Sequence, residues 1–171
     1  MQPDPSKGFE NYCDADFSGA WNKEFAPDDP STAKSCSGWI IFYAGCPIIF
    51  PSKLQGMVAL LTTEAECVTL LQSLRDVLPI MALVSEMKER KFRVICTEPY
   101  VYCKSFEDNS GALELAMLPK LCPQSKHINI NCHHFREHVH KGLVKMFPTF
   151  NGEGTQNIEA IAFDFLPPAT P

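Results

Sequence analysis

The sequence predicts a mixed α/β fold, and three observations on its apolar pattern support that prediction. The first part of the chain contains β-branched and aromatic runs, which are typical of strands. From Thr63 to Met87 the apolar residues recur at helical spacing. Beyond that point short strand-like runs are followed by helical patterns. Strands, a long helix and then further strands and helices predict a sheet covered by helices.

Three antiparallel strands are expected at the start of the chain. Phe9–Phe17 has the pattern of a strand that ends in a turn at Ser18 and Gly19. After a polar loop, the runs 38–43 and 47–50 are separated by a short segment that contains Gly45. This spacing predicts a hairpin, because a short glycine-containing loop joins antiparallel strands readily.

The longest helix is expected from Thr63 onward, where apolar residues fall on one helical face. Pro79 lies within this pattern and predicts a kink or a break, because proline lacks the backbone N–H that a helix interior needs. The remaining predicted elements are a short strand at 92–96, a strand at 100–106, a helix that starts at 109–111 and is closed by Pro119, a helix at 128–141 and a strand at 143–147.

Length and composition predict a single domain. A chain of 171 residues with 45% hydrophobic and 20% charged residues can bury a substantial core. We expect a flexible leader at 1–8, one domain at 9–165 and a disordered Pro-rich tail at 166–171.

Charge and cysteine usage exclude several classes of protein. The formal net charge of −5 argues against a stand-alone nucleic-acid binder, although a cluster of metal-binding carboxylates also raises the negative count. The eight cysteines form no Cys-x-x-Cys pair, so no thioredoxin motif or zinc ribbon is indicated. No signal peptide and no membrane-spanning stretch is expected, which favours a protein of the cytoplasm or nucleus that is not secreted.

Carboxylates recur in three short acidic segments, 12–17, 62–66 and 106–110, each at the predicted start or end of an element. Oxygen ligands suit Mg²⁺ or Mn²⁺ better than zinc, and carboxylates brought together from separate elements are typical of metal-dependent phosphodiester hydrolysis. Each carboxylate also has a local explanation. Asp14 or Asp16 is suited to a strand-end turn, Glu66 to a capping box with Thr63, and Asp108 to capping the helix that follows it.

The order of these segments and their flanking residues resembles the ribonuclease H region of copia-type LTR retrotransposon polyproteins. The resemblance extends from about Tyr12 to Pro148. It is carried by the segments Asp14–Gly19, Ser31–Trp39, Ser52–Gln55, Val58–Leu60, Thr62–Glu66, Asp108–Ala112 and Ser125–Ile128.

The resemblance implies a ribonuclease H-like fold, a mixed sheet of about five strands with flanking helices. It also implies that Asp14, Glu66 and Asp108 bind two Mg²⁺ or Mn²⁺ ions and catalyse hydrolysis of the RNA strand of an RNA/DNA hybrid. A reverse transcriptase domain is then an expected partner, and no small-molecule cofactor is expected. Asp16 shares a strand face with Asp14 and is a candidate supporting group, whereas Glu64 points away from Glu66 on a helix.

The chain departs from the family at the fourth carboxylate, which related enzymes supply from a helix after the last strand. Here the matching stretch, 154–162, has no aspartate, and Glu159 is the candidate substitute. A shift of one position turns a helical side chain by about 100°, so Glu159 would point in another direction than the expected aspartate. The alternative is therefore a catalytically impaired retroelement relic that keeps the fold and at most binds nucleic acid.

A basic stretch with all five histidines lies between 120 and 145. Lys126, His127 and Arg136 are the candidate contacts to nucleic-acid phosphates, with a solvated helix face as the alternative. His134 and His138 are one helical turn apart, so a zinc-binding interaction module is a third hypothesis, although the spacing fits no standard zinc motif.

Overall fold

The computed structural model describes residues 2–4, 6–24, 29–94, 101–117 and 135–149. A mixed sheet forms its centre, with the strand order β3-β2-β1-β5-β6, and β4 pairs with β2 beside β3. The strands are β1 Phe9–Asp16, β2 Cys36–Tyr43, β3 Cys46–Ile49, β4 Ser52–Leu54, β5 Cys103–Glu107 and β6 Val144–Pro148. The helices are the 3₁₀ turn η1 Pro30–Ala33, α1 Thr62–Glu89 and α2 Ser110–Met117, and residues 135–140 are also helical.

The first three strands pair antiparallel, as the hairpin pattern predicted. β1 then pairs parallel with β5, and β5 with β6, so the sheet is mixed. β4 was not predicted, because its three residues are all exposed and have no apolar alternation. It forms because β3 pairs only with residues 41–43 of β2, which leaves the other end of β2 free to pair with Ser52–Leu54.

Part of the predicted leader lies against the hairpin turn. The Asp4 amide donates to the Ala44 carbonyl at 2.8 Å, and the Ala44 amide donates to the Gly8 carbonyl at 3.0 Å. The predicted tail at 166–171 lies outside the described residues.

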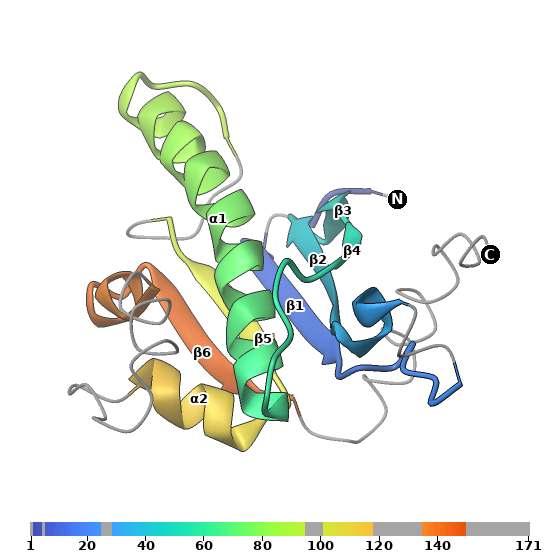
Figure 1. Ribbon diagram of the computed structural model, residues 1–171. Helices are drawn as coiled ribbons and strands as arrows, with labels where there is room; N and C mark the ends of the chain where they lie inside the picture. The colour runs from blue at the N-terminus through green and yellow to red at the C-terminus, as the bar shows by residue number, and fades with distance from the viewer. Residues whose placement is uncertain (1, 5, 25–28, 95–100, 118–134, 150–171) are drawn as a thin grey trace.

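The core lies between the sheet and α1. Alternate residues of β1, namely Phe9, Asn11, Cys13 and Ala15, are buried, while Asp14 and Asp16 are exposed. Leu70, Leu74 and Val77 of α1 are fully buried in one apolar cluster with Phe9 and Cys13. Figure 1 shows α1 running across the sheet, with its N-terminal end beside α2 and its C-terminal end projecting beyond the strands.

The helix α1 corrects two predictions. It continues through Pro79, so the proline does not break it. It is also long and apolar enough to cross a membrane by length and composition, which the sequence analysis did not anticipate. About 44% of that apolar stretch is buried inside the protein, and core helices of soluble proteins pass the same test. The apolar character of α1 is therefore explained by its packing on the sheet.

Candidate metal centre

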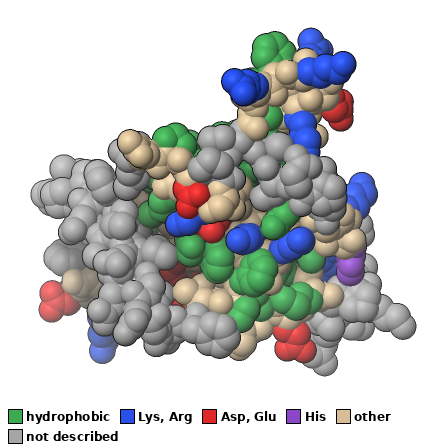
Figure 2. Space-filling view, turned by 180° about the vertical axis from the view of Figure 1, so that it is seen from behind, with side chains coloured by type: hydrophobic (Ala, Val, Ile, Leu, Met, Phe, Trp, Pro, Cys, Tyr) green, Lys and Arg blue, Asp and Glu red, His purple; other side chains and the backbone are tan. Residues whose placement is uncertain are grey.

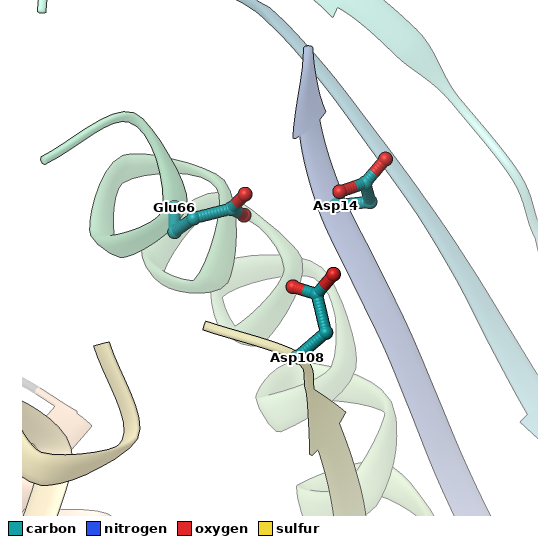
Figure 3. Close-up of side chains that lie close together, drawn as sticks. All are labelled: Asp14, Glu66 and Asp108. Carbon is teal, nitrogen blue, oxygen red and sulfur yellow. The ribbon is translucent and has the colours of Figure 1, made fainter. Parts of the chain in front are cut away.

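Three carboxylates from distant parts of the sequence converge at one edge of the sheet. Asp14 lies near the end of β1, Asp108 directly follows β5, and Glu66 lies near the start of α1. One oxygen of each lies within 4.8 Å of the others. Figure 3 shows the three side chains pointing toward a common space. Because β1 and β5 are parallel neighbours, their carboxyl ends reach the same edge, and α1 brings Glu66 to that edge from one face.

Local capping does not explain Glu66 or Asp108, because neighbouring residues form the hydrogen bonds at the first turns of α1 and α2. The N-cap residue of α1 is Leu61, and Glu64 accepts a hydrogen bond from the Leu60 amide at 2.8 Å. The predicted capping box between Thr63 and Glu66 is therefore wrong. At α2 it is Asn109, not Asp108, that accepts from the Ala112 amide, at 3.0 Å.

Two buried amide side chains hold the N-terminal half of α1 on the sheet. Gln55 Nε2 donates to Ser37 Oγ at 2.9 Å and to the Ala65 carbonyl at 3.0 Å, which joins β2 to the residue before Glu66. Asn11 Nδ2 donates to Ser73 Oγ and Ser105 Oγ, both at 2.9 Å, which joins β1, α1 and β5. Buried hydrogen bonds of this kind are directional, so they fix where α1 places Glu66.

Glu66 is the buried member of the group. Its residue is 6% exposed, whereas Asp14 and Asp108 are exposed. Burial, followed by the nearby carboxylates of Glu107, Asp14 and Asp108, raises the pKa of Glu66 to about 9, although a hydrogen bond from the Ala15 backbone acts to lower it. Its Oε2 atom is buried with no hydrogen-bond partner. A buried carboxylate oxygen without a donor is costly, and a cation between the three carboxylates would remove that cost.

Glu107 is a fourth carboxylate at this place that the sequence analysis did not single out. It is fully buried, and burial raises its pKa to about 7. The Cys13 thiol donates to its Oε2 at 3.4 Å, and the Asn109 amide donates to its Oε1 at 3.2 Å. The signal was present in the strand pattern, because Cys103, Ser105 and Glu107 alternate onto one face of β5. That face packs against α1, so a carboxylate at 107 has to be buried.

The other predicted site residues have different positions. Asp16 is exposed and lies outside the group of three, and its carboxylate packs against Gly19, where an added Cβ would come within 1.9 Å of it. Arg136, predicted to contact nucleic acid, is only 6% exposed, and its Nε donates to the Leu115 carbonyl at 2.7 Å. The surface position expected for Arg136 is therefore wrong.

The remaining predicted positions, Glu159, Lys126 and His127, lie outside the described residues, as do His133 and His134. Among the residues that the structure describes, Asp14, Glu66 and Asp108 are the group of His, Cys, Asp or Glu side chains with metal-binding spacing. The zinc hypothesis therefore gains no support from His138 and His140, which are described.

The chain is similar to curated proteins from plant transposons. It is 28% identical over 144 residues to the retrovirus-related Pol polyprotein from transposon TNT 1-94 of Nicotiana tabacum, a match that covers 84% of the chain. It is 30% identical over 135 residues to the corresponding polyprotein from transposon RE1 of Arabidopsis thaliana, with 79% of the chain covered. No family model matches the sequence.

Solved structures agree on the fold. An RNase H1 isolated from compost has a TM-score of 0.57 at 12% identity, covering 92% of this chain and 96% of that one. The N-terminal RNase H domain of a Mycobacterium tuberculosis protein has a TM-score of 0.54 at 9% identity, covering 92% of this chain and 94% of that one.

The fold is that of ribonuclease H, and the homologues are transposon Pol polyproteins. Both findings confirm the resemblance to copia-type polyproteins. The chain spans only 8% to 10% of the length of the curated relatives it matches. This ribonuclease H fold places carboxylates at the ends of β1 and β5 and near the start of α1, the three places that the resemblance implied.

Proposed function

We propose that this chain is a metal-dependent ribonuclease H that hydrolyses the RNA strand of RNA/DNA hybrids. The observation that carries the proposal is the convergence of Asp14, Glu66 and Asp108 within 4.8 Å. The ribonuclease H fold and the Pol polyprotein homologues support the same function. The 2′-hydroxyl of the RNA strand is the group that distinguishes it from DNA in such a substrate.

The residues present fit a divalent cation. All three ligands are carboxylates, which suits the hard ions Mg²⁺ and Mn²⁺, and Glu66 Oε2 is buried without a donor. We propose two such ions. When bound, they supply an activated water nucleophile and stabilise negative charge on the phosphate and the leaving oxygen.

The three carboxylates have different roles because their exposure to solvent differs. Asp14 and Asp108 are exposed, so a nucleic-acid phosphate can reach them from solvent. Glu66 is buried behind them and holds the inner side of the site, where the Ala15 backbone hydrogen bond orients its carboxylate. The buried surroundings of Glu66 have a low dielectric constant, which strengthens the attraction between its carboxylate and a cation.

The test is incubation of the purified chain with an end-labelled RNA/DNA hybrid and either Mg²⁺ or Mn²⁺. We expect cleavage of the RNA strand that falls about 1,000-fold in Asp14→Asn, because a group that stabilises transition-state charge is lost. Glu10→Gln is the matched control, since Glu10 lies on the same face of β1. An intact hybrid with the wild-type chain and both ions would contradict the proposal.

A second candidate function is hybrid binding without cleavage. The observation that favours it is the sequence of 154–162, which has no aspartate for the fourth carboxylate and offers Glu159 instead. Salt-sensitive binding of the hybrid without any cleavage would support this relic, because phosphate contacts weaken as salt rises. In either case we propose that a reverse transcriptase domain is the functional partner of this chain.

A further inference from the structure

The first turns of α1 and α2 meet in a small contact beside the metal centre. Thr63, near the start of α1, donates from Oγ1 to Asn109 Oδ1 at 3.4 Å. Asn109 in turn accepts from the Ala112 amide and so caps α2. Glu66 lies one turn along α1 from Thr63, and Asp108 directly precedes Asn109. The contact therefore joins the two segments that carry two of the three carboxylates.

Gly111 makes this close approach possible. A Cβ at position 111 would lie 3.0 Å from Thr63 Oγ1, 3.2 Å from Thr63 Cγ2 and 3.2 Å from Asn109 Oδ1. Ordinary contacts between such heavy atoms are about 3.5 to 4.0 Å. A side chain at this position would therefore push the first turn of α1 away from Asn109. At 3.4 Å the hydroxyl bond itself is long, so steric fit contributes more than hydrogen bonding.

We propose that Gly111 and Thr63 are positioning residues that set the spacing between the Glu66 and Asp108 carboxylates. The inference rests on the proposed metal centre, and it adds residues that do not contact the ion. Gly111 is needed because it has no side chain, and the Thr63 side chain packs directly against it. Residues that orient metal ligands in this way commonly change affinity about 10-fold when they are substituted.

The test is Gly111→Ala, with Mn²⁺ affinity measured by titration calorimetry. We expect about 10-fold weaker binding, because the displaced first turn of α1 moves Glu66 relative to Asp108. The melting temperature of the metal-free protein reports what the added Cβ costs in stability, and a merely structural role predicts a lower melting temperature with little change in affinity. Gly56→Ala is the matched control, since a Cβ at Gly56 would have no atom within 4 Å.

A compensating variant separates steric fit from general damage. In Thr63→Ala combined with Gly111→Ala, two of the three close contacts at the new Cβ are removed. We expect the double variant to bind Mn²⁺ within about 2-fold of Thr63→Ala alone, because coupled residues are non-additive. An additive loss, or a Gly111→Ala variant with wild-type affinity, would overturn the proposal.

A metal-free readout keeps this inference separate from the proposed function. If the wild-type chain binds no Mn²⁺, the metal centre itself is refuted. Crystal structures of the metal-free wild type and of Gly111→Ala then decide the spacing. A wider separation of Thr63 from residue 111, with Glu66 displaced from Asp108, supports the positioning role. Unmoved carboxylates contradict it.

Discussion

The two ends of α1 have opposite characters. The N-terminal half buries Ala65, Glu66, Cys67, Thr69, Leu70, Ser73, Leu74 and Val77, and it carries a buried carboxylate with no donor at one of its oxygens. After Pro79 only Met81 and Val84 of the helix are buried, while Leu83 is 57% exposed. Figure 2 shows Lys and Arg side chains gathered on the projecting end, where Arg90, Lys91 and Arg93 are exposed.

This difference shows where local sequence rules decide the structure and where they do not. The projecting end is stabilised by local interactions, such as the Glu86–Arg90 pair one turn apart. The N-terminal end is held by Gln55 and Asn11, which come from other elements. A carboxylate can remain buried at Glu66 only because the rest of the fold holds it there.

The largest expected effect comes from removing the carboxylate of Glu66 at the N-terminal end of this helix, compared with removing a carboxylate at the projecting end. Glu66→Gln should lower cleavage of an RNA/DNA hybrid by about 1,000-fold, because the buried ligand loses its charge. Glu86→Gln removes an exposed carboxylate and should leave the rate within about 2-fold, since an exposed i,i+4 ion pair contributes only about 0.3 to 0.5 kcal/mol. Equal rates for the two variants in a hybrid-cleavage assay would remove the functional distinction between the ends.

The pH dependence of stability should be set by the N-terminal end. Burial raises the pKa of Glu66 to about 9 and that of Glu107 to about 7 in the folded protein, from an ordinary value of 4.5. Between about pH 4.5 and pH 9 the folded state binds more protons than the unfolded state, so the free energy of unfolding falls as pH rises. From about pH 5 to pH 9 we expect the metal-free protein to lose on the order of 5 kcal/mol of stability, at about 1.4 kcal/mol per unit of raised pKa.

Chemical denaturation at several pH values measures this loss. Glu66→Gln should flatten the decline, leaving the smaller contribution of Glu107, whereas Glu86→Gln should not. Mn²⁺ should stabilise the wild type more at pH 8 than at pH 5, because a deprotonated site binds cations more tightly. A stability that rises between pH 5 and pH 9 without metal would show that these carboxylates are solvated.

Much of the fold was predictable because its signals are local. The strand runs and the helical period after Thr63 each depend on a few neighbouring residues. The strand β4 was missed because its pairing depends on the free end of β2. The break predicted as one alternative at Pro79 is also absent from α1, because tertiary packing of Val77, Met81 and Val84 on either side keeps the helix continuous.

The site divides in the same way. Asp14, Glu66 and Asp108 were singled out by the order of the three acidic segments together with the resemblance to copia-type polyproteins. Glu107 was missed because its importance comes from burial against α1. Gln55 was quoted only as part of a motif, and its role depends on carbonyl and hydroxyl partners from two other elements. Partners of this kind are distant in the sequence, so no local pattern reveals them.

The smallest expected effect lies at the projecting end, where Lys91 has a φ of 64°. Its amide donates to the Lys88 carbonyl at 2.9 Å, and the Phe92 amide donates to the Met87 carbonyl at 3.0 Å. This is the Schellman arrangement, in which glycine is preferred at the left-handed position because it has no Cβ.

Lys91→Gly should therefore stabilise the protein by about 0.5 to 1 kcal/mol, less the extra freedom that glycine gives the unfolded chain. Lys88→Gly, within the same turn but inside the helix, should destabilise by about 1 kcal/mol. Thermal unfolding of both variants, at about 2 to 4 °C per kcal/mol, tests the difference in sign. A lower melting temperature for Lys91→Gly would mean that the lysine side chain stabilises this end by more than its backbone conformation costs, so that tertiary contacts matter at both ends of α1.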